Sequence, residues 1–387
     1  MAADQIELAF GLLLALSLVA RVAVPYRPES PAPTVPVAAL SLVAFGALAV
    51  WGLTWFARWQ GAASGDAEPE ISRLIGVIAV ALVVGAGLLA RFVIVAWDLK
   101  PGMDVYPIQD AAGRAVLAGK DPYLTHVFQS GYPYWPLSAL LAAGGLVLGD
   151  VRWSLLAADA VTLIAFAVIA RNVNLPLSVG AIAGALFLWD AGGLYVTWQS
   201  MTEPLVIAFI MSGIALLTRP RPRGVLAGVA FGLAIATKQF AVGLLPLLPL
   251  SRKREPWIAF AAAVVASAFV LVPFIAADAT AFRAGSISSH LAEPARSYAF
   301  NLLDLLPGII DPVRAPFVVT AIAAMIAGSV VRLRWPDAVS GWLAATTALM
   351  IVAFALIGFS FINYYQIPLA LILVLALLPE ANAGEAE

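Results

Sequence analysis

The residues best suited to chemistry lie together in one polar stretch, residues 97–136, between two long apolar segments. Its charged and titratable side chains are Asp98, Lys100, Asp104, Asp110, Arg114, Lys120, Asp121 and His126. A carboxylate at a hydrated edge can take a proton from a reacting hydroxyl, and cations can stabilise an anionic leaving group. Because the surrounding chain is almost entirely apolar, this stretch is the first candidate for an active site.

The rest of the sequence has the composition of a membrane protein. Of its 387 residues, 62% are hydrophobic and 12% are charged, with a mean hydropathy of +0.94, whereas soluble domains are about one quarter charged. The apolar residues form blocks of about 20 residues, which match the thickness of a bilayer core. Only helices and closed barrels satisfy backbone groups in lipid, and barrel strands would give short alternating segments. We therefore predict an all-α, polytopic transmembrane bundle of about 10–12 helices.

The expected membrane segments follow from these blocks. They are residues 5–24, 35–56, 73–96, 136–149, 153–170, 176–190, 199–218, 224–250, 256–277, 314–331, 338–358 and 363–379. The first is predicted to be a membrane helix and not a cleaved signal, since no basic region precedes it. This organisation gives two N-terminal transmembrane helices within 1–72, a membrane domain over 73–379 and a short tail at 380–387.

Basic residues predict the orientation of the bundle. Arg and Lys cluster in three short loops, at 219–223, 252–254 and 332–334, and such loops normally face the cytoplasm. The C-terminal tail is then cytoplasmic. Two long loops, 97–135 and 278–313, lie on the extracytoplasmic side, where we expect the active site.

Two regions do not fit a simple succession of crossings. The block 224–250 has basic clusters at both ends and the polar triplet 237–239 at its centre, which predicts two half-helices that meet inside the protein. Residues 136–218 hold four short blocks where the charge pattern requires an odd number of crossings. We expect the block at 176–190 to be re-entrant or to lie on the surface, and such breaks in a bundle indicate a cavity.

A short amphipathic helix is expected inside the first long loop. Apolar residues between Ile108 and Leu117 recur at helical spacing, and Gly119 follows as a stop signal. A helix of this kind should lie flat at the outer membrane interface.

Several classes of site and partner are disfavoured by composition. The chain has no cysteine, which excludes disulfides, thiol catalysis and Cys-ligated zinc. Its two histidines, His126 and His290, argue against a His-rich metal site. A net charge of −1 without a long basic segment argues against nucleic acid as a partner. We expect neither a metal ion nor any other cofactor.

The polar stretch contains an ordered set of short motifs. They are Asp104–x–Tyr106, Leu117–Ala118–Gly119–Lys120–Asp121–Pro122–Tyr123 and Tyr132–Pro133–Tyr134–Trp135–Pro136–Leu137. This order resembles the first outer loop of the GT-C membrane glycosyltransferases. It is most similar to glycosyltransferase family 87, the polyprenyl-phosphate-mannose-dependent mannosyltransferases.

Further matches extend the resemblance over residues 73–379. Elements similar to those of the family are Trp198–Gln199 with Glu203–Pro204, the helix Gly228–Lys238 and the turn Asn363–Tyr364–Tyr365. The chain departs from the family at residues 134–136, where Tyr-Pro-Pro is usual, and at 199–203, where Gly-Gln-x-Asn is common.

The resemblance implies an inverting transfer of a sugar, in this family mannose, from a polyprenyl-phosphate donor to a glycolipid or cell-envelope glycan. The phosphate is already a good leaving group, so the acceptor hydroxyl chiefly needs a carboxylate base. Position and resemblance both give this role to Asp104, and a simple turn role after Gly102 is the alternative. One base without a nucleophile pair agrees with inversion.

Binding roles follow for other residues. The candidates for the donor phosphate are Lys238, His290, Arg296 and Arg91. The candidates for the sugar or acceptor are Tyr106, Asp110, Tyr123, Tyr132, Tyr134, Trp135, Gln199, Glu203, Asn363 and Tyr364. Lys238 could instead pair with Glu203 or Asp159, and Arg91 could extend to the interface. The aromatic residues could form an interfacial belt, and Asp110 could be a solvated helix charge.

Two other functions stay open at this point. A secondary transporter or lipid flippase would also contain broken helices and buried charges, although it would usually show matched halves, and none are evident. A non-catalytic GT-C-like scaffold would account for the altered motifs. Membrane lipids are expected partners in every case.

Overall fold

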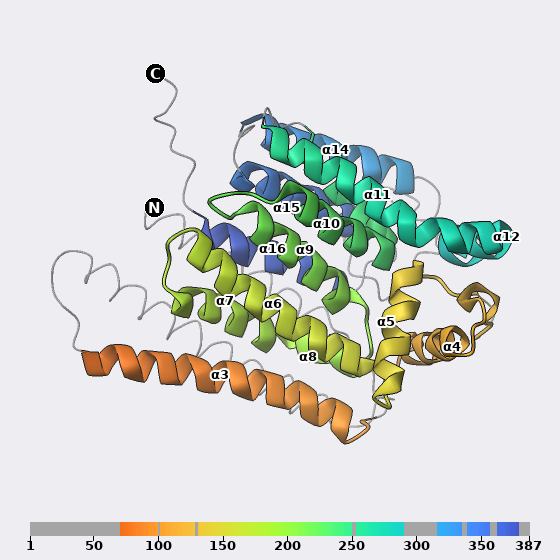
Figure 1. Ribbon diagram of the computed structural model, residues 1–387, viewed down its shortest axis with the longest axis horizontal. Coiled ribbons are helices and arrows are strands. Elements are labelled where there is room, and N and C mark those ends of the chain that lie inside the picture. The colour runs from red at the N-terminus through yellow and green to blue at the C-terminus, as the bar shows by residue number, and fades with distance from the viewer. Residues whose placement is uncertain are drawn as a thin grey trace, which may run out of the picture.

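The computed structural model describes residues 70–99, 101–127, 131–249, 253–289, 316–334, 339–356 and 362–378. Every regular element in this part of the chain is a helix, as Figure 1 shows. The prediction of an all-α fold is therefore confirmed. The segments expected at 5–24 and 35–56 and the tail at 380–387 lie outside the described residues.

Eight of the described helices form the body of the molecule. They are α3 (Glu70–Ala96), α6 (Arg152–Asn172), α9 (Glu203–Leu217), α10 (Gly224–Thr237), α11 (Arg254–Ala277), α14 (Pro316–Arg334), α15 (Val339–Leu356) and α16 (Gln366–Leu377). The other described elements are α4 (Val105–Leu117), η1 (Pro122–Leu124), α5 (Pro136–Val147), α7 (Leu177–Trp189), α8 (Ala191–Trp198), η2 (Gln239–Leu244), α12 (Ala279–Arg283), the π-helical η3 (Ala284–Ser288) and η5 (Ile362–Tyr365).

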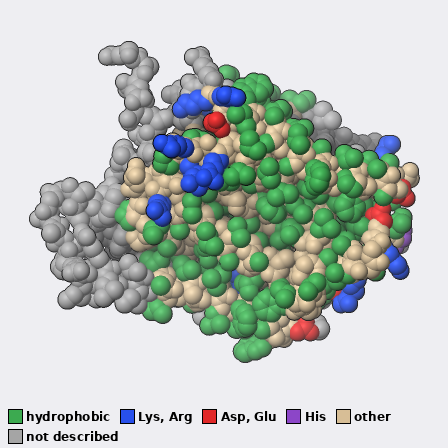
Figure 2. Space-filling view, in the orientation of Figure 1, with side chains coloured by type: hydrophobic (Ala, Val, Ile, Leu, Met, Phe, Trp, Pro, Cys, Tyr) green, Lys and Arg blue, Asp and Glu red, His purple; other side chains and the backbone are tan. Residues whose placement is uncertain are grey.

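The exterior of the bundle is apolar. By length and composition, α6, α11 and α15 could each cross a membrane, and the bent pair α7–α8 could form a fourth span, within the described residues. Phe269 on α11 is 81% exposed and Leu333 on α14 is 75% exposed. Figure 2 shows hydrophobic side chains over most of the face that it views. A soluble protein rarely exposes an apolar surface of this extent, so the chain is an integral membrane protein.

Small residues allow the central helices to approach closely. A Cβ atom on Gly228 would lie 2.3 Å from the carbonyl oxygen of Ala259, and one on Gly232 would lie 2.5 Å from that of Ala263. Both pairs are 31 residues apart in sequence, so α10 and α11 run parallel. Close backbone packing of this kind replaces the hydrophobic effect as the attraction between helices in lipid.

The break predicted at the centre of 224–250 is present. Helix α10 ends at Thr237, Lys238 has an extended backbone, and the short 3-10 helix η2 follows. The backbone N–H of Gly224 donates to Oε2 of Glu255 at 3.0 Å, so the chain returns to its starting end before α11 begins. The returning part is a 3-10 helix and turns, not the second half-helix that we expected.

The segment 176–190 forms α7, the first helix of a bent pair, and its burial shows that the expected surface position is wrong, whereas the re-entrant alternative stays a prediction. Helix α7 starts beside the last turns of α6, where a Cβ on Gly180 would touch Ala170. It is largely buried, and α8 follows after a bend of 61°. Gln199 then reaches the backbone after α3, at the other end of the bundle.

The segment 136–149 forms a helix shorter than a membrane span. Helix α5 has 12 residues, which is about 18 Å of helix, and it lies across one end of the bundle beside α4 (Figure 1). Between this point and the basic loop at 219–223, α6 is long enough to cross a membrane, α7–α8 is a bent pair and α9 is a shorter apolar helix. The odd number of crossings stays a prediction.

The amphipathic helix expected in the outer loop is α4. It spans Val105–Leu117, and Gly119 follows it with a left-handed φ of 67°. Its buried face packs on α5, where a Cβ on Gly113 would lie 3.0 Å from the backbone nitrogen of Ala143. Figure 2 shows a group of basic side chains at the opposite end of the molecule, where α10 and α11 begin. The sidedness of the two ends stays a prediction.

Candidate functional site

Asp104 lies at the start of α4, and its carboxylate is not used to cap the helix. It is the N-cap residue, yet its side chain accepts no capping hydrogen bond. Aspartate at this position normally bonds to the first free amides of the helix. Among the described residues, no hydrogen bond or ion pair engages this partly exposed carboxylate. It is therefore available to accept a proton from a substrate.

Gln199, which follows α8, fixes the backbone that leads into Asp104. Its Oε1 accepts hydrogen bonds from the backbone N–H groups of Gly102 and Met103, both at 2.9 Å. The next residue, Ser200, has a left-handed φ of 61°, which is uncommon for a non-glycine residue and turns the chain toward α9. Gln199 was predicted to contact the sugar or acceptor, but its carbonyl oxygen is occupied by the Asp104 segment.

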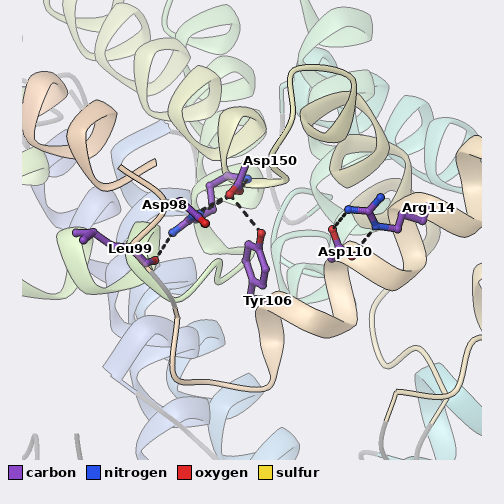
Figure 3. A network of polar contacts seen from close by, with 7 residues as sticks. Asp98, Leu99, Tyr106, Asp110, Arg114 and Asp150 are labelled. Carbon is purple, nitrogen blue, oxygen red and sulfur yellow. Dashed lines mark hydrogen bonds and ion pairs between the residues drawn. The ribbon is translucent and has the colours of Figure 1, made fainter. Parts of the chain in front are cut away.

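Arg152, the first residue of α6, fixes the other side of the same loop. Its buried guanidinium donates to the carboxylate of Asp150 at 2.7 Å and to the carbonyl of Leu99 at 2.8 Å, and it lies 3.4 Å from Asp98. The Tyr106 hydroxyl donates to Asp150 at 3.3 Å, as Figure 3 shows. Burial and the charge of Asp150 raise the pKa of Tyr106 to about 12. Tyr106, a predicted sugar contact, thus helps to hold α4 against α6.

Lys238 ends α10 inside the protein and pairs with Glu203 at the start of α9. Its Nζ lies 2.5 Å from Oε1 of Glu203, and the two residues are 3% and 0% exposed. The same ammonium lies 4.7 Å from the ring centroid of Tyr364, 5.1 Å from that of Phe240 and 5.2 Å from that of Tyr134. We call these five residues the Lys238 site. Of the alternatives for Lys238, the structure shows the pairing with Glu203.

Tyr134 belongs to the Lys238 site through its ring, whose centroid lies 5.2 Å from the Lys238 ammonium. Its phenol is buried, and burial raises its pKa well above the ordinary value, with further contributions from Tyr364, Glu203 and Asp104.

The remaining loop tyrosines form a small aromatic core. Tyr123 and Tyr132 are 2% and 1% exposed, with ring centroids 5.7 Å apart in an edge-to-face arrangement. The Tyr123 hydroxyl donates to the carbonyl of Tyr134 at 2.9 Å, and the Tyr132 hydroxyl donates to Gln109 at 3.1 Å. Burial raises the pKa of both phenols. These rings lie neither in an interfacial belt nor open to a sugar, because they support the loop from inside.

Gln239 joins three segments at the break after α10. Its Nε2 donates to the carbonyl of Pro133 in the first outer loop at 3.1 Å and to that of Ser286 in η3 at 3.3 Å. A single π-helical turn such as η3 often accompanies a functional site. Gln239 was not among the predicted site residues, although its place beside Lys238 in an otherwise apolar block was a usable signal.

Several buried polar atoms without a hydrogen-bond partner belong to the Lys238 site or to residues next to it in sequence. Those atoms are Trp135 Nε1, Ser200 Oγ, Thr202 Oγ1, Glu203 Oε2, Gln239 Oε1 and Asn363 Oδ1. The two amide atoms of Gln366 are also unpartnered, but Gln366 lies beside Gly193 of α8. In folded proteins such atoms normally have a protein or water partner, and each one left without it costs about 1–3 kcal/mol. The free Glu203 oxygen beside Lys238 is therefore a group that water or a ligand could bind. Trp135, Asn363 and Tyr364 were predicted members of this site.

Other predicted residues lie apart from it or outside the described chain. Asp110 forms a two-point ion pair with Arg114, at 2.7 and 3.0 Å, on the exposed side of α4 (Figure 3). Arg91 is 1% exposed and pairs with Asp159 at 2.8 Å, so it does not extend to the interface. His290 and Arg296 lie outside the described residues.

The described residues contain no group of three or more Asp, Glu or His side chains that could hold a metal ion. The structure therefore names no metal ligands in this part of the chain, and the prediction of a metal-independent reaction stays a prediction.

Comparison with known proteins gives a structural relationship only. Scans against protein-family models and curated proteins find no match. The solved structures that match include two of ArnT from Cupriavidus metallidurans, one bound to undecaprenyl phosphate and one in the apo state. Each has a TM-score of 0.53, with 16% and 17% identity respectively, over 77% of this chain and 59% and 58% of ArnT. The chain thus spans about three fifths of the length of ArnT.

At this level of identity, the similarity shows the fold alone. It confirms the helical membrane fold of the GT-C type and gives no support for a membership of family 87 in particular. The protein is therefore an integral membrane protein with a GT-C fold similar to that of ArnT.

Proposed function

We propose that the protein is a glycosyltransferase that moves a sugar from a polyprenyl-phosphate donor to an acceptor hydroxyl, with Asp104 as the general base. The uncapped carboxylate of Asp104, held by Gln199 beside a buried polar region, is the observation that carries this proposal. ArnT binds undecaprenyl phosphate in one of its structures, which supports a polyprenyl phosphate as the lipid.

In the proposed reaction, the acceptor oxygen attacks the anomeric carbon of the sugar while Asp104 takes the hydroxyl proton. The bond between the anomeric carbon and the phosphate oxygen breaks, and the polyprenyl phosphate leaves with the bonding electrons. The base and the leaving group lie on opposite faces of the sugar, so its configuration inverts. The partly exposed position of Asp104 provides the hydrated edge that an ionised carboxylate needs.

The finer parts of the proposal come from the resemblance in sequence. They are mannose as the sugar, a glycolipid or cell-envelope glycan as the acceptor and an extracytoplasmic active site. The clustering of basic residues at the opposite end of the bundle supports the last of these.

The test is sugar transfer by purified wild-type and Asp104→Asn protein, with labelled undecaprenyl-phosphate sugars and a membrane-lipid extract. We expect the substitution to lower turnover by roughly a hundredfold to ten-thousandfold, the usual contribution of a general base, with donor binding retained. Asp278→Asn is a matched control because Asp278 is also an N-cap residue, but its carboxylate accepts a capping bond from Ala281 at 2.8 Å. Near-normal turnover by Asp104→Asn would remove Asp104 as the base.

The same assay separates the alternatives. A flippase would move the lipid between leaflets of a vesicle without forming a glycoside, and a scaffold would do neither. Absence of transfer by the wild-type protein from every hexose and pentose donor tested would overturn the proposed function.

A further inference from the structure

The Lys238 site has little remaining capacity for a phosphate. The ammonium of Lys238 is neutralised by Glu203 at 2.5 Å, and three aromatic rings lie within 5.2 Å of it. A phosphate placed here would meet a buried carboxylate, and like charges in a buried place repel strongly.

Three of the unpartnered polar atoms in or next to the site can only accept a hydrogen bond, whereas Trp135 Nε1 can only donate and the hydroxyls of Ser200 and Thr202 can do both. Oε2 of Glu203 and Oδ1 of Asn363 are buried without partners, on residues that are 0% and 4% exposed. Oε1 of Gln239 is a third, and its orientation is fixed because Nε2 of the same amide donates to two carbonyl oxygens. Such oxygens require a donor. Phosphate oxygens at neutral pH offer none, whereas each sugar hydroxyl offers one.

One of these acceptors touches the ammonium, and the other two come from adjoining residues. Glu203 touches Lys238 directly, Gln239 is its neighbour in sequence, and Asn363 precedes Tyr364, whose ring centroid lies 4.7 Å from the ammonium. Tyr134, Phe240 and Tyr364 add aromatic rings to the site. A carboxylate, two neutral amide oxygens and aromatic rings are groups suited to binding a polyhydroxylated ring.

We infer that Glu203, Gln239 and Asn363 bind hydroxyl groups of the transferred sugar, and that Lys238 holds the Glu203 carboxylate in position instead of binding the donor phosphate. This inference rests on the proposed function, deepens it, and replaces the role first predicted for Lys238. The buried Glu203 carboxylate also restricts the substrate class, because its unpartnered oxygen would repel the carboxylate of an acidic sugar. The transferred sugar is therefore neutral or carries an amino group.

The test measures the affinity contributed by the sugar, separately from that contributed by the lipid phosphate. Dissociation constants are determined in nanodiscs for undecaprenyl phosphate, for undecaprenyl-phosphate mannose and for amino-sugar and uronic-acid donors. We define the sugar gain as the dissociation constant of undecaprenyl phosphate divided by the dissociation constant of the sugar-bearing donor. The variants are Glu203→Gln, Lys238→Met and the double variant Glu203→Gln/Lys238→Met, which leaves no uncompensated buried charge.

The single variant Glu203→Gln distinguishes two roles of Lys238, binding of the donor phosphate and positioning of Glu203, by the change in affinity for undecaprenyl phosphate. If Lys238 bound phosphate, removal of the competing carboxylate would strengthen the binding of undecaprenyl phosphate. We expect that affinity to change less than about threefold, while the sugar gain falls roughly tenfold to a hundredfold, as for loss of a hydrogen bond to a charged group. The double variant should show the same pattern, and it keeps the test valid if either single variant fails to fold.

Thr346→Val provides the control, because the Thr346 hydroxyl on α15 is also buried without a partner but lies in the packed core. It should leave the sugar gain unchanged.

A tenfold loss of undecaprenyl phosphate affinity in Lys238→Met or in the double variant would overturn the inference. So would an unchanged sugar gain, or tighter binding of a uronic-acid donor than of a neutral one. Wild-type protein that binds undecaprenyl phosphate without any sugar gain would overturn the inference and leave the proposed lipid intact. Absence of binding to every lipid would overturn the proposed function itself.

Discussion

Gln199 offers the sharpest test of how the fold prepares Asp104. Its Oε1 accepts the backbone N–H groups of Gly102 and Met103 at 2.9 Å. Gln199→Leu keeps the approximate size of the side chain and removes both hydrogen bonds. The segment that carries Asp104 then loses two polar contacts with the turn between α8 and α9.

The size of the effect follows from these two bonds. Each amide–carbonyl bond contributes about 1 kcal/mol net, and both donors lie in a loop where water can partly replace the lost acceptor. We expect a loss of about 2 kcal/mol in the free energy of unfolding. A base displaced by about 1 Å costs roughly a hundredfold in rate, so turnover should fall by about two orders of magnitude while donor affinity is retained.

The assay is a double-mutant cycle on turnover with Asp104→Asn, Gln199→Leu and both together. Because Gln199 acts only through Asp104 in this reasoning, Gln199→Leu should cause no further loss once Asp104 is neutral. Gln199→Glu retains an acceptor oxygen and should recover part of the rate. Additive losses in the double variant, or a rise in KM without a fall in kcat, would refute the positioning role and restore Gln199 as a substrate contact.

Three further predictions concern the support of the site. Arg152→Met should lower the free energy of unfolding by about 3–5 kcal/mol, because it leaves the buried Asp150 without its partner; an unchanged melting temperature in detergent would contradict this. Gly232→Ala should destabilise the protein by about 1–3 kcal/mol, since a Cβ would lie 2.5 Å from the carbonyl of Ala263, whereas Gly144→Ala, with nothing within 4 Å, should be neutral or slightly stabilising. The Tyr106 pKa is raised from 10.0 to about 12, so its contribution to stability should be complete below pH 10 and lost between pH 10 and 12; ultraviolet titration of wild type against Tyr106→Phe measures this, and ionisation of Tyr106 near pH 10 would contradict it.

The sequence was sufficient for features that depend on composition and local spacing. Long apolar blocks predicted helices in a membrane, because lipid leaves the backbone few other ways to satisfy its polar groups. The polar triplet at Lys238 predicted a break in its helix, and the apolar spacing after Asp104 predicted α4. Each of these signals lies within about 20 neighbouring residues, as a helical period and a bilayer thickness require.

Features that depend on long-range contacts needed the structure. The charge pattern required one non-crossing block between 136 and 218, but only the structure showed that α5 lies across one end of the bundle and that α7 and α8 form a bent pair. From the sequence, the loop tyrosines could have formed an interfacial belt or contacted the sugar. The structure shows that Tyr123 and Tyr132 are buried in a small aromatic core within the loop.

By itself, the sequence determined that this is a helical membrane protein with a long polar loop at 97–135, and it singled out Asp104 in that loop. The tertiary structure decided what surrounds Asp104. Gln199 is 95 residues away along the chain, and Glu203 and Lys238 are 35 residues apart, so no local pattern pairs them. Contacts like these satisfy the hydrogen-bond donors and acceptors of the side chains involved. A polar atom can be identified as available to a substrate only when the tertiary structure shows that no other group bonds to it.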